Sequence, residues 1–409
     1  MKKSNIKQKT YKILDIFSGA GGMSLGFEST KRFISIGAVD SWEPACETYT
    51  YNHPELNPDA IVNFDITKIF NPREKSNLFS LWNVKKGDID VILGGPPCQG
   101  MSLAGKRLSD DPRNMLFRCF VEMVRLLQPK IFVMENVPGL LSTGHGNINS
   151  AILDAFKEIK YNHFDQHKPE VLKAECYGVP QIRRRLFYVG FRPDIPFTSF
   201  HWPPTHTHLS ISANDYDSGN LFSSTLDYDF SLKPSVTVSE AISDLPYILS
   251  GEGEEEMEYP VTNKKKLSSF QKQMRDWSNC PYSNLKPKVY NHVAPKHTKK
   301  LIDMIKKAKP GESVDPKYTD SKMWHPDKPG YTVKALGAGG GSTNRRAFHY
   351  DSNCPRASTV RENARIQSFP DWYHFMGAKT HQMSQVGNAV PPILAKVIAE
   401  SLLGILDKK

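Results

Sequence analysis

Short, continuous apolar runs alternate with helical patterns through the first half of the chain. The runs are rich in Ile and Val and lack a strict alternation of apolar and polar residues. They span residues 11–17, 34–40, 61–66, 89–95, 131–137 and 185–191. Strands that are buried on both faces of a parallel sheet have this pattern.

The segments between the later runs each carry one apolar face at helical spacing. In residues 114–130 this face consists of Leu116, Phe117, Phe120, Val121, Val124 and Leu127. In residues 151–159 it consists of Ile152, Phe156 and Ile159. The alternation predicts an α/β domain with a doubly wound, mostly parallel sheet over residues 1–198.

The pattern changes after residue 198. Irregular segments follow, among them the acidic run 251–260 and the glycine cluster 335–346, and apolar periodicity is weak there. We therefore expect a second, smaller and loop-rich domain over residues 199–360. Residues 361–409 form a C-terminal segment that ends in an amphipathic helix after Pro391 and Pro392.

Composition narrows the class of protein. With 409 residues the chain is long enough for two domains with a sizeable core. A net charge of +10 fits a solvated basic surface and a phosphate-bearing partner equally well. Six scattered cysteines without a CxxC pair favour a reducing cytoplasm and predict neither a zinc site nor a disulfide framework. We expect no signal peptide and no membrane span, because no run approaches about 18 apolar residues.

A glycine-rich stretch, DIFSGAGGMSLGF at 15–27, follows the first predicted strand. It departs from the GxGxxG pattern of dinucleotide sites, since Ser24 stands where the third glycine belongs. Asp40 and Asp65 end the next two predicted strands, at the same edge of the sheet. This combination suits an adenosine with a tail that carries no phosphate.

Three further polar features follow later strands. Cys98 comes after Pro96 and Pro97 at the end of the fourth strand, where a thiolate nucleophile is more plausible than an inert buried thiol. Glu135 ends the fifth strand and is a candidate acid. Gln181, Arg183 and Arg185 alternate at strand spacing, which predicts that they share one face; a charged edge strand is the alternative.

The chain resembles the DNA (cytosine-5)-methyltransferase family in an ordered set of motifs. They are DIFSGAGGMSLGF, the acid Asp40, Asp65-Ile66, GGPPCQG, ENV, QIRRR, TVRENARIQSFPD and QVGNAVPP. The set runs from about residue 11 to 400 and skips the variable stretch. The resemblance implies the α/β fold of S-adenosylmethionine-dependent methyltransferases and the modification half of a bacterial type II restriction system.

The resemblance also implies a binding site for S-adenosylmethionine. Its residues would be Phe17, Ser18, Gly19, Gly21, Gly22, Asp40, Ser41, Asp65, Ile66, Leu116, Asn388 and Val390. Asp40 would bind the ribose, and Asp65 with Ile66 the adenine. Asn388 and Val390 would close the pocket, so the C-terminal segment returns to the first domain. The resemblance leaves open whether Ser41 or the next residue, Trp42, covers the adenine.

By the same resemblance, Cys98 adds to carbon 6 of a cytosine flipped out of double-stranded DNA. Glu135 holds and protonates nitrogen 3, and Arg185 with Arg183 orients the base. Residues 100–114 would close over the flipped base as a lid. Expected DNA contacts are Gln99, Ser102, Lys106, Arg107, Arg113, Gln181, Arg345 and Arg346.

The second domain would then recognise the target sequence. Its glycines at 337, 339, 340 and 341 and the pair Arg345-Arg346 fit a DNA contact and a plain flexible loop equally well. Arg361, Glu362, Arg365 and Gln367 match a family motif that organises this domain, and we expect structural roles for them. We expect the protein to be a monomer. Its relation to a cognate restriction endonuclease would be functional rather than physical.

Three alternatives accompany this interpretation. A tRNA cytosine methyltransferase shares the motifs, but the long variable region and the sequence CPRASTV before RENA favour DNA. A non-catalytic DNA-binding homologue would be expected to lack Cys98 or Glu135, and both are present. A nucleotide-dependent oxidoreductase leaves PPCQ, ENV and QIRRR unexplained.

Overall fold

The computed structural model describes most of the chain. The described residues are 8–97, 115–142, 147–161, 167–196, 200–210, 231–260, 266–315, 317, 321–335 and 347–408.

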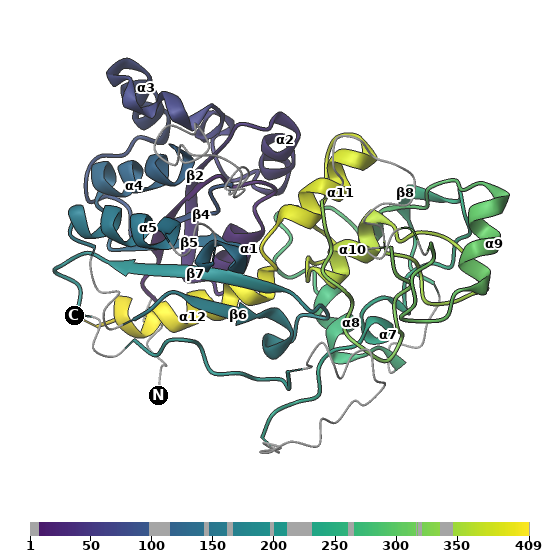
Figure 1. Cartoon of the computed structure of the whole chain (residues 1–409). Coiled ribbons are helices and arrows are strands. Elements are labelled where there is room, and N and C mark those ends of the chain that lie inside the picture. Colours follow the sequence, from purple (N-terminus) through teal and green to yellow (C-terminus); the bar gives the residue numbers. More distant parts are fainter. Residues whose placement is uncertain are drawn as a thin grey trace, which may run out of the picture.

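A seven-stranded sheet dominates the first half of the molecule (Figure 1). Its strands are β1 (Tyr11–Ile16), β2 (Phe33–Asp40), β3 (Ile61–Asn63), β4 (Val91–Gly94), β5 (Ile131–Asn136), β6 (Glu170–Lys173) and β7 (Arg184–Phe191). The order is β3-β2-β1-β4-β5-β7-β6, and the strands from β1 to β5 are parallel. Strand β7 is antiparallel to both β5 and β6. The predicted doubly wound, mostly parallel sheet is therefore confirmed.

The predicted strands appear with two differences. The third ends at Asn63, so Asp65 lies beyond the strand and precedes a 3₁₀ turn, Ile66–Phe70. Strand β6 was missed, because its sequence EVLK is short, half polar and only partly buried. An edge strand of this kind carries too few apolar positions to show a period.

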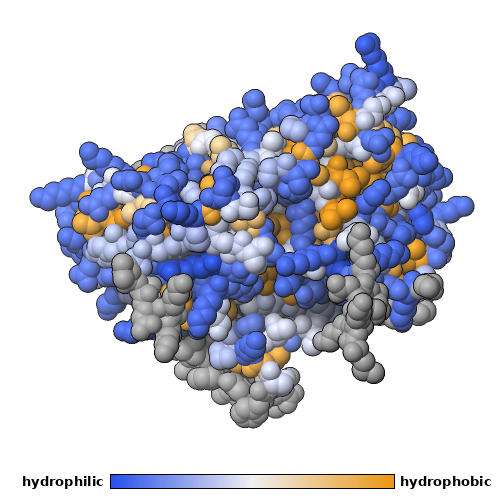
Figure 2. Space-filling model, turned by 180° about the vertical axis from the view of Figure 1, so that it is seen from behind, coloured by the Kyte–Doolittle hydropathy of each residue, from blue (hydrophilic) through white to orange (hydrophobic). Residues whose placement is uncertain are grey.

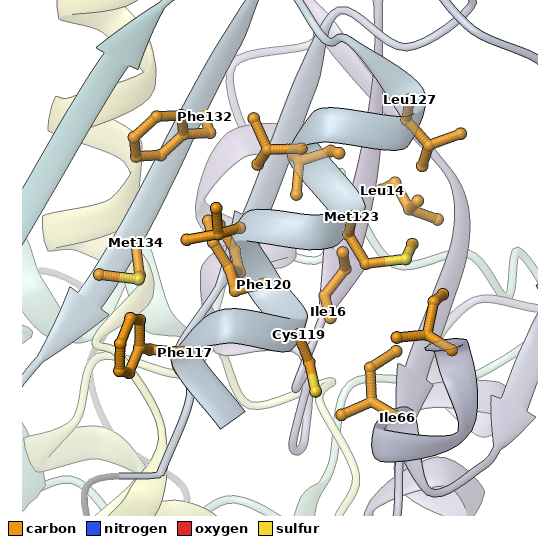
Figure 3. Packing of buried hydrophobic residues seen from close by; sticks show 14 of the residues in the cluster. Leu14, Ile16, Ile66, Phe117, Cys119, Phe120, Met123, Leu127, Phe132 and Met134 are labelled. Carbon is orange, nitrogen blue, oxygen red and sulfur yellow. The ribbon is translucent and has the colours of Figure 1, made fainter. Parts of the chain in front are cut away.

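Helices cover both faces of the sheet. On one face, α3 (Pro72–Trp82), α4 (Met115–Leu127) and α5 (Asn147–Glu158) pack against Leu14, Ile16 and Phe132. Figure 3 shows Phe117, Phe120 and Leu127 of α4 packed over strands β1 and β5. The predicted apolar face of α4 is thus confirmed, with Leu116 only half buried.

The opposite face of the sheet is covered by α1 (Gly22–Glu28) and α12 (Pro392–Leu406). Leu394, Ile398 and Leu402 of α12 are fully buried in this layer. The C-terminal segment therefore returns to the first sheet, and Tyr11 Oη donates to the Leu406 carbonyl at 2.6 Å.

One helical stretch of the described residues, 379–406, is long and apolar enough to cross a membrane by length and composition alone. It contains α11 (Lys379–Asn388) and α12, and 61% of its most apolar window is buried inside the protein. Packing against α1 and the sheet explains these apolar residues as part of the core. The face seen in Figure 2 is largely hydrophilic, with apolar side chains in scattered groups.

The second part of the chain is irregular. It holds the hairpin β8 (Gly253–Met257) and β9 (Val289–Val293) and the short helices α7 (Val238–Ile242), α8 (Ser269–Met274), α9 (Lys299–Lys307) and α10 (Val360–Ile366). These elements lie beside the sheet domain (Figure 1). The helix α2 (Glu43–Asn52) completes the first part.

Buried ion pairs organise the second part around α10. Arg365 contacts Asp371 at 2.6 Å and Asp244 at 2.9 Å, and Arg356 contacts Glu362 at 2.7 Å. All five side chains are almost completely buried. The motif residues for which we expected structural roles lie in or beside this cluster.

Candidate active site

A cavity of about 880 Å³ opens where the parallel strands end. Its walls come from the glycine loop after β1, the ends of β2 and β5, the turn after β4, and residues 385–390 of the C-terminal segment. The strand order reverses between β1 and β4, at the centre of this edge. Ligands of doubly wound sheets bind at such a reversal, outside the carboxyl ends of the strands.

The glycine loop is shaped by its backbone. Phe17 and Gly19 both have positive φ angles, 59° and 52°. The Gly19 amide donates to Asp40 Oδ2 at 2.8 Å, which joins the loop to the end of β2. A Cβ on Gly22 would lie 2.4 Å from the Val390 carbonyl oxygen, so this position requires glycine. The loop and the C-terminal segment therefore form one continuous wall.

Gly21 has a different role from the one expected. It does not line the cavity; a Cβ there would lie 2.9 Å from Tyr373 Oη and from a ring carbon of Tyr49. Its φ of 77° also favours glycine. Gly21 thus lets α1 begin against two buried tyrosines.

Asp40 and Asp65, which follow strands β2 and β3, accept hydrogen bonds from nearby backbone amides. Asp40 accepts hydrogen bonds from Gly19 and Trp42 amides, while burial raises the pKa of its carboxyl. Asp65 is exposed and accepts from the Thr67 amide at 3.0 Å, and Ile66 beside it is buried. Both acids and Ile66 line the cavity.

The expected cofactor residues converge, and the structure adds others. Every one of them except Gly21 lines the cavity. Sequence reasoning missed Asp15, Ala20, Met23, Val39, Phe64, Asn136, Leu140, Gln385 and Ala389 as lining residues. Trp42 also lines it and makes an edge-on ring contact with His381 at 5.6 Å. Most of these residues lie next to an expected cofactor or catalytic residue in the sequence. That adjacency was the signal by which they could have been predicted.

Asp15 is the most unusual of the added residues. Its carboxylate is 2% exposed and accepts a hydrogen bond from Ser24. Burial, with Asp40 and Glu28 nearby, raises the pKa of Asp15 to about 7. An acidic side chain with this pKa changes charge near neutral pH at the floor of the cavity.

The cavity offers suitable groups for an adenosine-based ligand. The Ser18 hydroxyl is buried and has no hydrogen-bond partner within the described structure, so it is available to a ligand. Asp40 and Asp65 supply carboxylates to the cavity, and Trp42, Phe64 and Leu116 supply apolar surface. Among the described residues, no group of three or more His, Cys, Asp and Glu side chains is placed to hold a metal ion.

A buried ion pair marks the other end of the cavity. Arg185 Nε lies 2.8 Å from Glu135 Oε1, and the two side chains are 15% and 12% exposed. Burial raises the pKa of Glu135 above its ordinary value, although Arg185 and Arg183 act in the opposite direction. Pro96 and Pro97 line the same end, and Asn136 donates to the Pro96 carbonyl at 3.1 Å.

The three residues that we expected to share one face differ in exposure. Gln181 and Arg183 are fully buried and do not line the cavity, whereas Arg185 does. Strand β7 begins at Arg184, after the two buried residues. The Arg183 guanidinium donates to the carbonyls of Val333, Gly387 and Ala389. The side chains of Gln181 and Arg183 are thus engaged inside the protein, and Arg183 acts electrostatically on Glu135.

Several expected site residues lie outside the described residues. They are Cys98, Gln99, Ser102, Lys106, Arg107, Arg113, Arg345 and Arg346. The first six of these residues, Cys98 to Arg113, fall between Pro97 and Met115, where the described chain stops and resumes. Pro97 lines the cavity, so the chain enters the segment that holds Cys98 from this site.

Comparisons with known proteins agree along the whole chain. A model of the C-5 cytosine-specific DNA methylase family matches residues 11–404. Type II methyltransferase M.DdeI of Desulfomicrobium norvegicum is 35% identical over 95% of this chain and 88% of its own length. Type II methyltransferase M1.HphI of Haemophilus parahaemolyticus is 33% identical, over 95% and 86%. A crystal structure of a putative DNA modification methyltransferase encoded within an E. coli prophage superposes with a TM-score of 0.70, at 26% identity, covering 98% of this chain and 100% of that one.

Proposed function

We propose that this chain, which belongs to the C-5 cytosine-specific DNA methylase family and is a DNA (cytosine-5-)-methyltransferase, methylates a cytosine flipped out of a specific short DNA duplex sequence. One observation carries the proposal: the Glu135–Arg185 pair and the glycine loop with Asp40 line the same cavity. One site thus contains both an acidic side chain that could protonate the cytosine and a glycine loop that could bind an adenosine-based methyl donor.

S-Adenosylmethionine, when bound, would supply an electrophilic methyl group. The glycine loop, with the free Ser18 hydroxyl, would receive its tail. Asp40 would bind the ribose, and Asp65 with Ile66 the adenine, against the apolar surface of Trp42. Asn388 and Val390 would close the site from the C-terminal segment.

The residues at the other end would activate the cytosine. The Cys98 thiolate would add to carbon 6, and Glu135 would donate a proton to nitrogen 3, which makes carbon 5 nucleophilic. After methyl transfer to carbon 5, a base acting through water would remove the carbon 5 proton. The thiolate would then leave from carbon 6, and nitrogen 3 would return its proton to Glu135. The raised pKa of Glu135 favours its role as the acid. Arg185 would hold both Glu135 and the base in place.

DNA binding would divide between two regions. We propose 1–198 as the catalytic domain, 199–360 as the target recognition domain, and 361–409 as the segment that returns to the catalytic domain. Gln99, Ser102, Lys106, Arg107 and Arg113 would contact DNA from the lid, and Arg345 with Arg346 from the recognition domain. The net charge of +10 is compatible with a phosphate-bearing partner.

The biological setting follows from the type II relatives. We propose that the enzyme acts as a monomer on DNA in a bacterial cytoplasm. Methylation at its target would protect host DNA from a cognate restriction endonuclease, without a physical complex between the two enzymes.

Genome-wide sequencing tests the reaction and maps the target sequence at the same time. The protein is expressed in a bacterial strain free of cytosine methylation, and genomic DNA is bisulfite-sequenced, since 5-methylcytosine resists conversion. We expect protected cytosines within one short sequence, and none with Cys98→Ser. An unmethylated genome from cells with soluble wild-type protein would contradict the function.

A covalent trap tests the mechanism. Duplexes of the mapped sequence with 5-fluorocytosine at the target are incubated with S-adenosylmethionine and protein. We expect a denaturant-resistant adduct with wild-type protein, none with Cys98→Ser, and slower formation with Glu135→Gln. Methylation without any such adduct would exclude the Cys98 step while leaving the overall reaction intact.

A further inference from the structure

Two basic side chains lie opposite each other at the edge of the sheet where the cavity opens. Lys173 is the last residue of β6 and Arg184 is the first residue of β7, and the two are direct partners in the antiparallel pair. Two residues further along β7, Leu186 pairs with Asn136, the last residue of β5 and part of the cavity wall. Lys173 and Arg184 therefore stand beside the cavity, at the outer end of the same edge.

Arg184 lies between two arginines with different surroundings. Arg183 is fully buried, while Arg185 lines the cavity and pairs with Glu135. The Arg185 guanidinium also donates to the Arg184 carbonyl at 2.7 Å, which ties the backbone of Arg184 to a residue of the site. The family resemblance gave roles to Arg183 and Arg185 and none to Arg184.

A buried carboxylate holds the Arg184 side chain. Arg184 Nη1 lies 2.5 Å from Glu175 Oε1, and the side chains are 30% and 0% exposed. The second carboxylate oxygen, Glu175 Oε2, is buried and has no hydrogen-bond partner among the described residues. Desolvating a carboxylate costs free energy that one ion pair repays only in part. The result is a guanidinium that is held in one position while part of its surface stays exposed.

Positive charge is in excess at this place. Like charges that lie directly opposite each other in a sheet are destabilising. Lys173 is exposed, and its ammonium group reaches the Ser210 hydroxyl at 3.5 Å but forms no ion pair within the described part of the chain. Since Glu175 pairs with Arg184, the charge of Lys173 is left for a partner outside the chain.

We propose that Lys173 and Arg184 bind neighbouring backbone phosphates of the DNA beside the flipped cytosine, with Glu175 as the positioning residue of Arg184. The proposal rests on the proposed function, which places the cytosine in the cavity next to Arg185. Lysine, arginine and serine side chains are common partners of DNA phosphates, and Ser210 adds a hydroxyl donor here. Phosphates in this position would offset the like-charge pair and hold the strand from which the cytosine is flipped.

The salt dependence of DNA binding tests the proposal. Dissociation constants are measured between about 0.05 and 0.2 M salt, with a duplex of the mapped target sequence and with an unrelated duplex. Loss of one phosphate contact lowers the slope of log binding constant against log salt by about 0.9, which corresponds to about 8-fold weaker binding at about 0.1 M salt. We expect this loss for Lys173→Ala and for Arg184→Ala, equally on both duplexes, with unchanged affinity for S-adenosylhomocysteine.

Arg192→Ala is the matched control. Arg192 follows the opposite end of β7, away from the cavity, and its guanidinium pairs with Asp194 at 2.6 Å with 22% of the side chain exposed. We expect the wild-type slope for this variant. Arg184→Ala leaves the buried Glu175 without its partner, so the exposed Lys173 provides the test if that variant does not fold.

Glu175→Gln tests the positioning role. The amide oxygen can still accept a hydrogen bond from Arg184, and the positive charge of Arg184 remains. We therefore expect the wild-type salt slope together with a loss of affinity smaller than about 8-fold, because Arg184 is held less firmly. Wild-type affinity, or a slope lowered as in Arg184→Ala, would contradict this role.

The outcomes separate the inference from the proposed function. If wild-type protein methylates DNA but Lys173→Ala or folded Arg184→Ala protein keeps the wild-type slope, the inference alone is overturned. An equal loss in Arg192→Ala would also overturn it, as would a loss confined to the target duplex, which would indicate contacts to bases. Absence of methylation by wild-type protein is the separate failure of the function.

Discussion

The two halves of the molecule are stabilised by different interactions. Around the sheet, most buried residues are aliphatic or aromatic, as in the layer that contains Ile13, Val91 and Ile398. Around α10 the interior holds charged groups, above all the Arg365–Asp371 pair and the Arg356–Glu362 pair. Apolar packing tolerates changes of shape to some extent. A buried ion pair fails when one partner is removed, because the other charge stays unpaired.

Among the substitutions that would reveal this difference between the two halves, Arg365→Ala should have the largest effect on stability. The substitution leaves the buried carboxylates of Asp371 and Asp244 without their shared partner. We expect a loss of about 3–5 kcal/mol in the free energy of unfolding. Denaturant titration would measure it, with Arg125→Ala as the control.

Arg125 is half exposed and pairs with Glu122 one turn away on α4. An exposed pair of this kind contributes about 0–1 kcal/mol. Equal losses for the two arginines would contradict the claim that burial makes the Arg365 cluster essential.

The corresponding change in the apolar half is Leu402→Ala. Leu402 is fully buried where α12 meets the sheet layer, and truncation there leaves a cavity. We expect a loss of about 2–4 kcal/mol, measured in the same titration. The loss should be nearly independent of pH between about 5 and 8, since no titratable partner is removed. A strong pH dependence would show that the two halves are not distinct in this way.

The sequence predicted the apolar half better than the polar half for a physical reason. Strands buried on both faces are continuous apolar runs, so β1, β2, β4, β5 and β7 were visible one by one. The glycine stretch, Asp40 and Asp65 were predicted because short segments at strand ends converge at one edge. The places of Leu116, Asn388 and Val390 in the cavity were implied by the family resemblance. Asp15 was missed: nothing in the local pattern says that a carboxylate is buried there.

The partners of Gln181 and Arg183 could not be predicted from local pattern. Their hydrogen bonds go to Val333, Gln367 and Ala389, between 150 and 206 positions away along the chain. Spacing suggested a shared face, but it did not show that tertiary contacts bury both side chains. The same holds for Arg365 and Asp244, which are separated by 121 positions. Such pairs depend on how distant segments meet, which periodicity does not encode.

The smallest expected effect brings the comparison into the cavity itself, where the Asp15 carboxyl lies buried with Asp40 and Glu28 nearby. The pKa of Asp15 is raised from 3.8 to about 7, mainly by burial. Below about pH 3 the carboxyl is largely protonated in both the folded and the unfolded chain. As pH rises toward 7, the unfolded chain releases the proton more readily, so folding stability falls across this window.

Asp15→Asn should remove that pH dependence. The amide has nearly the same shape, and its oxygen can still accept from Ser24. The pKa shift fixes the change in the difference between about pH 3 and about pH 8 at about 4 kcal/mol. We expect the variant to gain about 1–2 kcal/mol over wild type at about pH 8 and to be about 2–3 kcal/mol less stable than wild type at about pH 3. The gain is smaller than the full shift would give at about 1.4 kcal/mol per pKa unit, because the amide must also be desolvated. Unfolding titrations at several pH values, without cofactor, would measure it; a difference that is constant with pH would mean that Asp15 is ionised in the folded protein throughout, and that burial at the cavity floor does not govern its charge.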